Sequence, residues 1–183
     1  SNYFGTVTIS NSTISGNTAT YGGGILANSG SQANITFSTI FDNVALGEGG
    51  GIAIMTYDSR KPSQVALRNT LVAVNYAPTG PDIAGALTSG GYNLIQDVSG
   101  ALFIPNKQHH TDVSVNAHAD MRINLRWSGN LIQVLGLLPG SPVIDQIPLG
   151  ACHINGISTD QHGVKRPDGN EKACDIGAFE SST

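Results

Sequence analysis

Charged side chains are scarce in this sequence: Asp, Glu, Lys and Arg make up 12% of its 183 residues, against roughly 25% in an average soluble protein. Nine Lys and Arg residues against 13 Asp and Glu give a formal net charge of -4. So few cations leave no basic patch of the kind that binds nucleic acid. Long apolar runs are also missing, since none reaches the roughly 18 residues of a membrane-spanning helix. The sequence therefore predicts neither a nucleic-acid partner nor a transmembrane segment.

Cysteine is equally sparse, because Cys152 and Cys174 are the only two and neither belongs to a Cys-x-x-Cys motif. Two cysteines cannot form a zinc site by themselves, and we predict no metal or other cofactor. A disulfide closing the loop between them would stabilise the fold by roughly 3 kcal/mol. We predict this disulfide, which favours an extracytoplasmic location.

Ser, Thr and Asn are abundant, with 46 residues together, and one phrase is repeated. It reads NSTISGN at 11–17, FSTIFDN at 37–43 and NTLVAVN at 69–75, and Gly-Gly-Gly-Ile follows the first two. Between the closing residues Asn17, Asn43 and Asn75 the periods are 26 and 32 residues. Self-similarity at such a period indicates a stacked solenoid rather than one globular core.

Apolar residues alternate within each repeat, as expected of short strands with one buried face. Three columns are predicted to stack: Val7 on Ala33 and Val65, Ile9 on Ile35 and Leu67, and Ile14 on Ile40 and Val72. Strands that recur without a helical crossover stack in parallel, about 4.8 Å apart. We predict an all-β fold, a right-handed parallel β-helix of about three to four coils over residues 1–100, with the hand set by crossover chirality.

Each predicted coil has an Asn at the same corner. Stacked in register, Asn17, Asn43 and Asn75 are expected to pass side-chain hydrogen bonds from coil to coil, at exposed corner positions. A structural ladder, rather than ligand binding, is their predicted role.

The repeats stop near residue 100, and residues 101–183 are predicted to form an irregular last coil and a loop-rich C-terminal capping region. The apolar stretch 131–145 followed by a loop-rich tail suits a cap over an open coil. The N-terminus has no comparable cover, since the sequence opens Ser1-Asn-Tyr-Phe without an initiator Met or a signal peptide. We expect an excised or processed piece of a longer protein, preceded by further coils.

The order of motifs along the chain resembles one bacterial family. The repeats are followed by ALTSGGYNLI at 86–95, LLPGSPVID at 137–145, TDQHGVKRP at 159–167 and CDIGAFE at 174–180. This order is similar to the C-terminal region of choice-of-anchor Q domain proteins, whose repeats resemble those of the polymorphic outer membrane protein family. The resemblance covers nearly the whole chain and implies a pectin-lyase-like parallel β-helix on a secreted or cell-surface protein. Residues 113–136 depart from the family pattern, and the family implies no defined activity.

Catalysis by a β-helix would need clustered carboxylates, or Asp with Ca²⁺ and a basic residue, on one sheet face. Asp42 and Asp82 are the candidate catalytic residues if the chain is an enzyme. Asp42 is expected to stack on Gly16 and Val74, so no row of carboxylates forms. The acids of the tail are expected to hold irregular loops together beside Lys165 and Arg166; they are Asp145, Asp160, Asp175 and Glu180.

One segment carries the ligand types of a transition-metal site: it contains His109, His110, Asp112, His118 and Asp120. Because no HxH or HxxxH pair is present, we predict a surface loop and no metal site. Flat β-solenoids with a continuous row of Thr bind ice. No such row is expected here, since Thr8 is expected to stack on Asn34 and Ala66.

Tyr21, Tyr57 and Tyr76 are candidate glycan contacts, because aromatic rings stack on sugar faces. We expect a non-catalytic secreted or cell-surface β-helix, structural or adhesin-like, with a cell-surface glycan or protein as partner. The alternative is a carbohydrate-active β-helix, a polysaccharide lyase or glycoside hydrolase, whose groove lies partly in preceding coils. Carboxylates aligned across those coils would favour the alternative.

Overall fold

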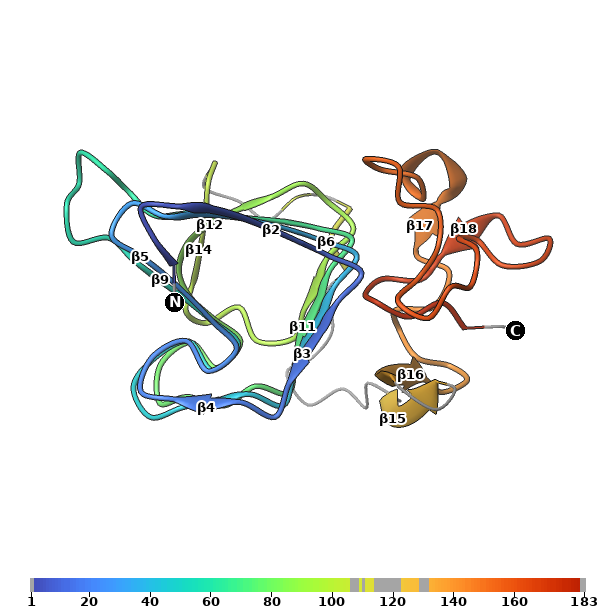
Figure 1. The fold of residues 1–183 in the computed structure, drawn as a ribbon, viewed down its shortest axis with the longest axis horizontal. Helices are drawn as coiled ribbons and strands as arrows, with labels where there is room; N and C mark the ends of the chain where they lie inside the picture. The colour runs from blue at the N-terminus through green and yellow to red at the C-terminus, as the bar shows by residue number, and fades with distance from the viewer. Residues whose placement is uncertain (1, 106–108, 110, 114–122, 129–131, 182–183) are drawn as a thin grey trace.

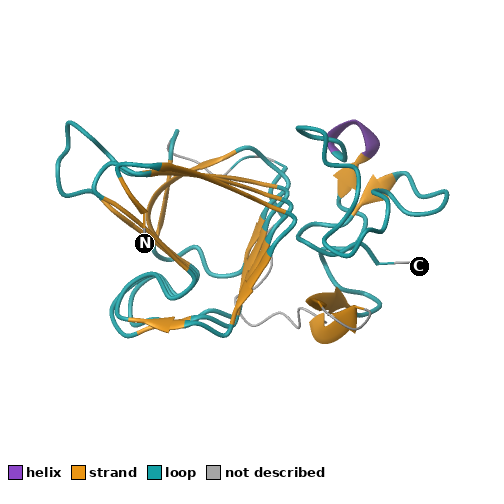
Figure 2. Ribbon diagram, in the orientation of Figure 1, coloured by secondary structure: helices purple, strands orange, loops and turns teal. Residues whose placement is uncertain are grey.

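The computed structural model describes residues 2–105, 109, 111–113, 123–128 and 132–181 (Figure 1). Figure 2 shows strands and loops throughout this part of the chain, with one short 3-10 helix, η1 (Leu149–Ala151). The predicted all-β class is confirmed. Most strands pair in parallel and form several separate sheets. Helical structure long and apolar enough to cross a bilayer is not found among the described residues.

Three groups of parallel strands make up most of the fold. The β2 sheet contains β2 (Thr6–Ser10), β6 (Gln32–Thr36), β10 (Gln64–Arg68), β12 (Ile83–Ser89) and β14 (Ala101–Phe103). The β5 sheet contains β1 (Asn2–Tyr3), β5 (Ile25–Asn28), β9 (Ile52–Met55) and the first residues of β12, which joins the two sheets. The β3 sheet contains β3 (Thr13–Ser15), β7 (Thr39–Phe41), β11 (Leu71–Ala73) and β13 (Leu94–Ile95).

Three two-stranded pairs complete the described strands. In the first pair, β4 (Thr18–Ala19) and β8 (Val44–Ala45) are parallel. The other two pairs are antiparallel: β15 (Ile123–Ser128) with β16 (Ile132–Leu137), and β17 (Ile147–Pro148) with β18 (Ala173–Cys174).

The strands recur in one order along the chain, and Figure 1 shows those of successive repeats overlying one another. We number the repeats 6–31, 32–63 and 64–86, with a fourth that begins at residue 87. The predicted register is confirmed in all three columns; in the third, Ile14 pairs with Ile40 and Ile40 with Val72. Parallel pairing also continues past the expected limit at residue 100, because β14 pairs with β12 and Val113 bridges to Leu94.

The apolar columns meet in an interior enclosed by the three sheets. Ile35, Ile40, Leu67 and Val72 are at most 1% exposed there. A stacked repeat buries its inward side chains only where both neighbours cover them. In the first repeat, the corresponding side chains Val7, Ile9 and Ile14 are therefore only partly buried.

The Gly-Gly-Gly segments allow close contact between repeats. Only the first glycine of each, Gly22 and Gly49, has a positive φ, of 59° and 67°. Gly23 and Gly50 lie where an added Cβ would collide with a carbonyl oxygen of the next repeat. Gly23 and Gly50 must be glycine because the backbones of neighbouring repeats touch there. Gly22 and Gly49 have a positive φ, which glycine adopts without steric cost.

The segment after β16 lies along the side of the repeats, beside β3 and β11, as the orange to red chain of Figure 1 shows. Asn11 Nδ2 of the first repeat donates to Thr159 O at 2.7 Å, and Asn69 O of the third accepts from Gly177 N at 3.0 Å. The expectation that this segment caps an open coil is therefore wrong. A segment that contacts successive repeats covers a side of the stack and not its end.

The physical reason for this placement is a second apolar core on the outer face of the β3 sheet. Phe37, Leu71 and Leu94 from the repeats are packed there with Val143 and Ile176 of the C-terminal segment, and all five are at most 1% exposed. Parallel sheets are usually buried on both faces. The β3 sheet is thus covered by the interior on one side and by the C-terminal segment on the other.

Candidate functional site

The Asn column forms the ladder that the sequence predicts. Asn17 Nδ2 donates to Asn43 Oδ1 at 2.9 Å, and Asn43 Nδ2 donates to Asn75 Oδ1 at 3.0 Å. The same two oxygens accept the backbone N–H groups of Asn17 and Asn43. The expected exposure is wrong for Asn43 and Asn75, which are 0% and 7% exposed, because the neighbouring repeats cover them.

The ladder ends on a carboxylate. Asp82 Oδ1 accepts from Asn75 Nδ2 at 2.8 Å, and its Oδ2 accepts from the Asp97 N–H at 2.8 Å. A carboxylate offers acceptors only, so it ends a row of donors without leaving a donor unpaired. Asp82 is 1% exposed, and burial raises the pKa of its carboxyl to about 6, although these hydrogen bonds lower it.

The two candidate catalytic residues do not combine into a site. Asp42 is exposed at a corner with φ 55°, in one column with Gly16 (φ 68°) and Val74 (φ 59°). Within the described residues the Asp42 carboxylate forms no hydrogen bond or ion pair with Asp82 or any other side chain. Asp82 is 1% exposed and its carboxylate is bonded to Asn75, so the structure does not bring it together with Asp42.

A second polar column precedes the β3 sheet strands, and the sequence motifs do not predict it. Ser12 N donates to Ser38 Oγ at 3.4 Å, Thr70 N to Asn93 Oδ1 at 3.0 Å, and Asn93 N to Asp112 Oδ1 at 2.9 Å. This column also ends on a carboxylate. Its residue type changes from repeat to repeat, so only the strand register could have predicted it.

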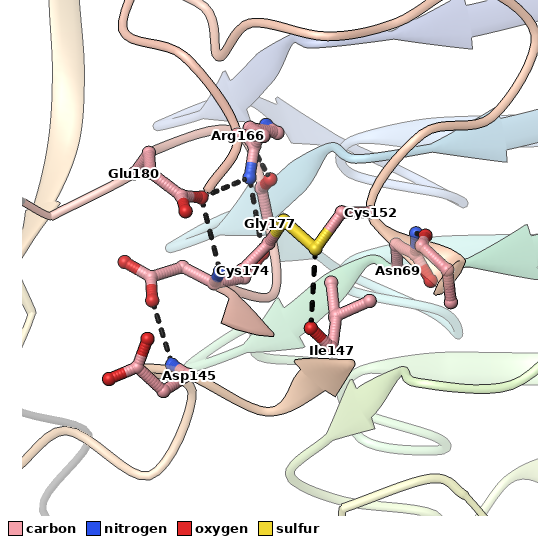
Figure 3. Close-up of a disulfide and its surroundings, with 10 residues drawn as sticks. Asn69, Asp145, Ile147, Cys152, Arg166, Cys174, Gly177 and Glu180 are labelled. Carbon is pink, nitrogen blue, oxygen red and sulfur yellow. Dashed lines mark hydrogen bonds and ion pairs between the residues drawn. A yellow bond between two sulfur atoms is a disulfide. The ribbon is translucent and has the colours of Figure 1, made fainter. Parts of the chain in front are cut away.

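A buried ion pair organises the C-terminal segment (Figure 3). Arg166 Nη1 donates to Glu180 Oε2 at 2.9 Å and Nη2 to Gly177 O at 2.8 Å, with both charged side chains fully buried. The guanidinium also lies 4.6 Å from the ring centroid of Phe37, a cation–π contact with the second repeat. Burial raises the pKa of Glu180 to about 8, while the Arg166 cation lowers it.

Asp160 and Asp175 hold loops of the tail, as the sequence predicts, whereas Asp145 contributes its backbone N–H. Asp175 Oδ2 accepts from the backbone N–H and the hydroxyl of Ser181, both at 2.7 Å, and its Oδ1 accepts from Asp145 N. Asp160 accepts from the N–H groups of Val164 and Glu180. These carboxylates replace the regular hydrogen bonding that the segment lacks.

Cys152 and Cys174 form the predicted disulfide, with an S–S distance of 2.05 Å and both residues 0% exposed. Figure 3 shows it between the chain after η1 and strand β18, where Cys152 Sγ also lies 3.3 Å from Ile147 O. The bond therefore closes the loop that contains Arg166.

The His-containing segment is described only in part. His110, His118 and Asp120 lie outside the described residues. Asp112 Oδ2 accepts from the His109 N–H at 3.1 Å and from the Ser89 hydroxyl at 2.7 Å. In the part of the chain that the structure describes, no group of three or more His, Cys, Asp or Glu side chains could hold a metal ion.

Two of the three candidate glycan-binding tyrosines line the same groove. Tyr21 and Tyr57, which are 45% and 74% exposed, line it together with Glu48. Tyr76 is 64% exposed but lies on the third repeat, where its backbone bridges to Val44, and it does not line this groove.

The described residues thus contain a groove lined by Tyr21, Tyr57 and Glu48, whereas Asp42 and Asp82 are not brought together. Comparison of the chain with protein-family models, curated proteins and solved structures gives no match.

Proposed function

We propose that this chain is a segment of a right-handed parallel β-helix with a structural or adhesin-like, non-catalytic role on a secreted or cell-surface protein. The observation that carries the proposal is that five carboxylates of the chain are engaged in hydrogen bonds that hold the fold. Asp82, Asp112, Asp160, Asp175 and Glu180 all accept internal hydrogen bonds. Carboxylates committed to the fold are not available to protonate or deprotonate a substrate.

The β-helical architecture is supported by the recurrent strand order and by the parallel, in-register pairing of successive repeats. The right hand is inferred from the strong preference of parallel crossover connections. The motif resemblance to choice-of-anchor Q domain proteins and to the polymorphic outer membrane protein family supports the same architecture.

The first repeat favours a continuation of the β-helix into preceding coils. Its half-buried side chains Val7, Ile9 and Ile14 line a depression of about 570 Å³. The side-chain oxygen of Asn17 accepts no hydrogen bond from any described residue, whereas those of Asn43 and Asn75 each accept two from the preceding repeat. One more coil would cover the apolar side chains and supply the missing donors.

An extracytoplasmic location is supported by the disulfide, since such bonds persist in oxidising compartments. Because few residues are charged, the surface is polar but carries little charge. A cell-surface glycan or protein is the partner class that suits this setting.

The proposal is tested by incubating the chain with a panel of neutral glycans and polyuronates, with and without Ca²⁺. Reducing ends and unsaturated products are then measured. We expect no turnover by the wild type or by Asp42→Asn. Robust turnover that disappears in Asp42→Asn would overturn the proposal and support the carbohydrate-active alternative, because Asp42 is the exposed acid of the candidate pair.

A further inference from the structure

The groove beside the β5 sheet has lining residues from two successive repeats. It has a volume of about 420 Å³ and is lined by Tyr21 of the first repeat and by Glu48, Ile54, Met55, Thr56 and Tyr57 of the second. In Figure 1 the chain between β4 and β5 bends back toward β5 and β9. Tyr21 belongs to this segment and lines the groove.

The Tyr21 wall is fixed by contacts with the next repeat. Gly47 N donates to Thr20 O at 2.8 Å, and Gly22 N donates to Glu48 O at 3.1 Å. A Cβ on Gly47 would collide with the Tyr21 ring, so the missing side chain creates the space that the ring occupies. Tyr21 is thus positioned before any ligand arrives, which lowers the entropic cost of binding.

The part of the lining that contains Tyr57 belongs to the loop that follows β9. The Tyr57 hydroxyl donates to Met55 Sδ at 3.2 Å. Ser63 fastens the base of this loop, because its hydroxyl donates to Met55 O at 2.8 Å and its N–H donates to Thr56 Oγ1 at 3.1 Å. The ring of Tyr57 remains 74% exposed and available for contact.

The lining is rich in π faces and acceptors and contains no cation. The half-buried Glu48 carboxylate has no hydrogen bond or ion pair with any described residue. The two basic residues of the neighbouring loop are engaged elsewhere, since Lys61 lies over the Phe4 ring and Arg60 pairs with Asp58. A ligand that brings positive charge and apolar surface would satisfy all of these groups.

We propose that this groove binds an alkylammonium group, held by the faces of Tyr21 and Tyr57 and by the charge of Glu48. Neutral sugars suit it less well, because the lining has no amide, guanidinium or ammonium side chain and the donors that it leaves open are the hydroxyls of Tyr21 and Thr56. An amino sugar of a surface polysaccharide and a quaternary ammonium headgroup both carry the required chemistry. The inference deepens the surface-binding part of the proposed function and relies on it for the biological setting.

The test titrates the folded chain with glucosamine, N-acetylglucosamine and tetramethylammonium, and follows tyrosine fluorescence and NMR shifts. We expect glucosamine to bind at least tenfold more tightly than its neutral acetylated analogue, and tetramethylammonium to compete with it. Glu48→Gln should weaken glucosamine binding about tenfold, and Tyr57→Ala should weaken the binding of both glucosamine and tetramethylammonium.

Tyr76→Ala is the matched control, because Tyr76 is similarly exposed but lies outside the groove. Circular dichroism establishes that each variant is folded. Stronger binding of glucosamine than of tetramethylammonium would identify an amino sugar as the source, and the reverse would identify a quaternary headgroup. Equal binding of the acetylated sugar, or no binding of either cation, would overturn the inference and leave the non-catalytic β-helix proposal intact.

Discussion

At the scale of single residues, stability depends on whether a side chain has a repeat on both sides. Ile40 is fully buried between Ile14 and Val72, whereas Ile14 has a neighbour on one side only. We predict that Ile40→Ala lowers the free energy of unfolding by about 2 to 5 kcal/mol, as expected for a core truncation that leaves a cavity. Ile14→Ala should cost clearly less. Urea denaturation of both variants measures the difference, and a neutral Ile40→Ala would mean that the register is wrong.

The Asn ladder gives a second residue-scale prediction. Replacing Asn43 by Ala removes its side-chain bonds to Asn75 Oδ1 and to the Ile14 carbonyl, and it leaves the N–H of Asn17 without its acceptor. Unsatisfied buried groups cost roughly 1 to 3 kcal/mol each. Asn43→Ala should therefore destabilise the fold by about 2 kcal/mol or more, and Asn17→Ala by less than 1 kcal/mol. If equilibrium unfolding showed the same loss of free energy for both variants, Asn17 would not be the end of the ladder with a neighbour on one side only.

The Asp82 carboxyl predicts a dependence of stability on pH. Its pKa is raised from 3.8 to about 6 in the folded state, mainly by burial. A raised pKa contributes stability that is full below pH 3.8 and is lost as pH rises through 6. Two pH units correspond to about 3 kcal/mol. Unfolding free energies of wild type and Asp82→Asn between pH 4 and 8 should thus differ in slope, with the wild type falling more steeply; parallel profiles would refute this role.

At the scale of the elements, the C-terminal segment is held by a disulfide in a region with little regular pairing. The two cysteines are 22 residues apart, and a loop of this length is stabilised by about 3 kcal/mol when closed. We predict that reduction, or Cys152→Ala with Cys174→Ala, lowers the melting temperature while the parallel strands remain. Far-ultraviolet circular dichroism follows the strands, and alkylation with mass spectrometry counts free thiols. Two free thiols in the untreated folded protein would disprove the bond.

Elements could be predicted from the sequence where the same residue types recur at a fixed period. The columns of Ile14, Ile40 and Val72 repeat in residue type, so alternation and period were enough to assign both strands and register. The Arg166–Glu180 pair joins residues of two different motifs, and the sequence supports only the statement that such acids hold loops.

Other features could not be predicted because they depend on contacts between distant segments. The lateral position of the C-terminal segment follows from the outer face of the β3 sheet, which is known only after folding. The role of Asp82 depends on the third repeat bringing it back to Asn75. The groove of Tyr21 and Tyr57 requires residues from two repeats and the absence of a side chain at Gly47.

At the scale of the whole molecule, the stack has a covered side and an open first repeat. The C-terminal segment buries the outer face of the β3 sheet, while Val7, Ile9 and Ile14 remain partly exposed. In a stacked-repeat protein the stability is close to a sum of repeat and interface terms. The central claim is that the first repeat is built to receive another coil in the same register.

The most direct test inserts a copy of residues 6–31 immediately before residue 6, so that a duplicate first repeat can stack on the original. The urea midpoint is then measured, with a matched insertion that carries Lys at the copies of Val7 and Ile9 as control. We predict a higher midpoint for the duplicate, protection of its amides from hydrogen exchange, and neither effect in the control. A duplicate that leaves the midpoint unchanged and exchanges its amides freely would contradict the account.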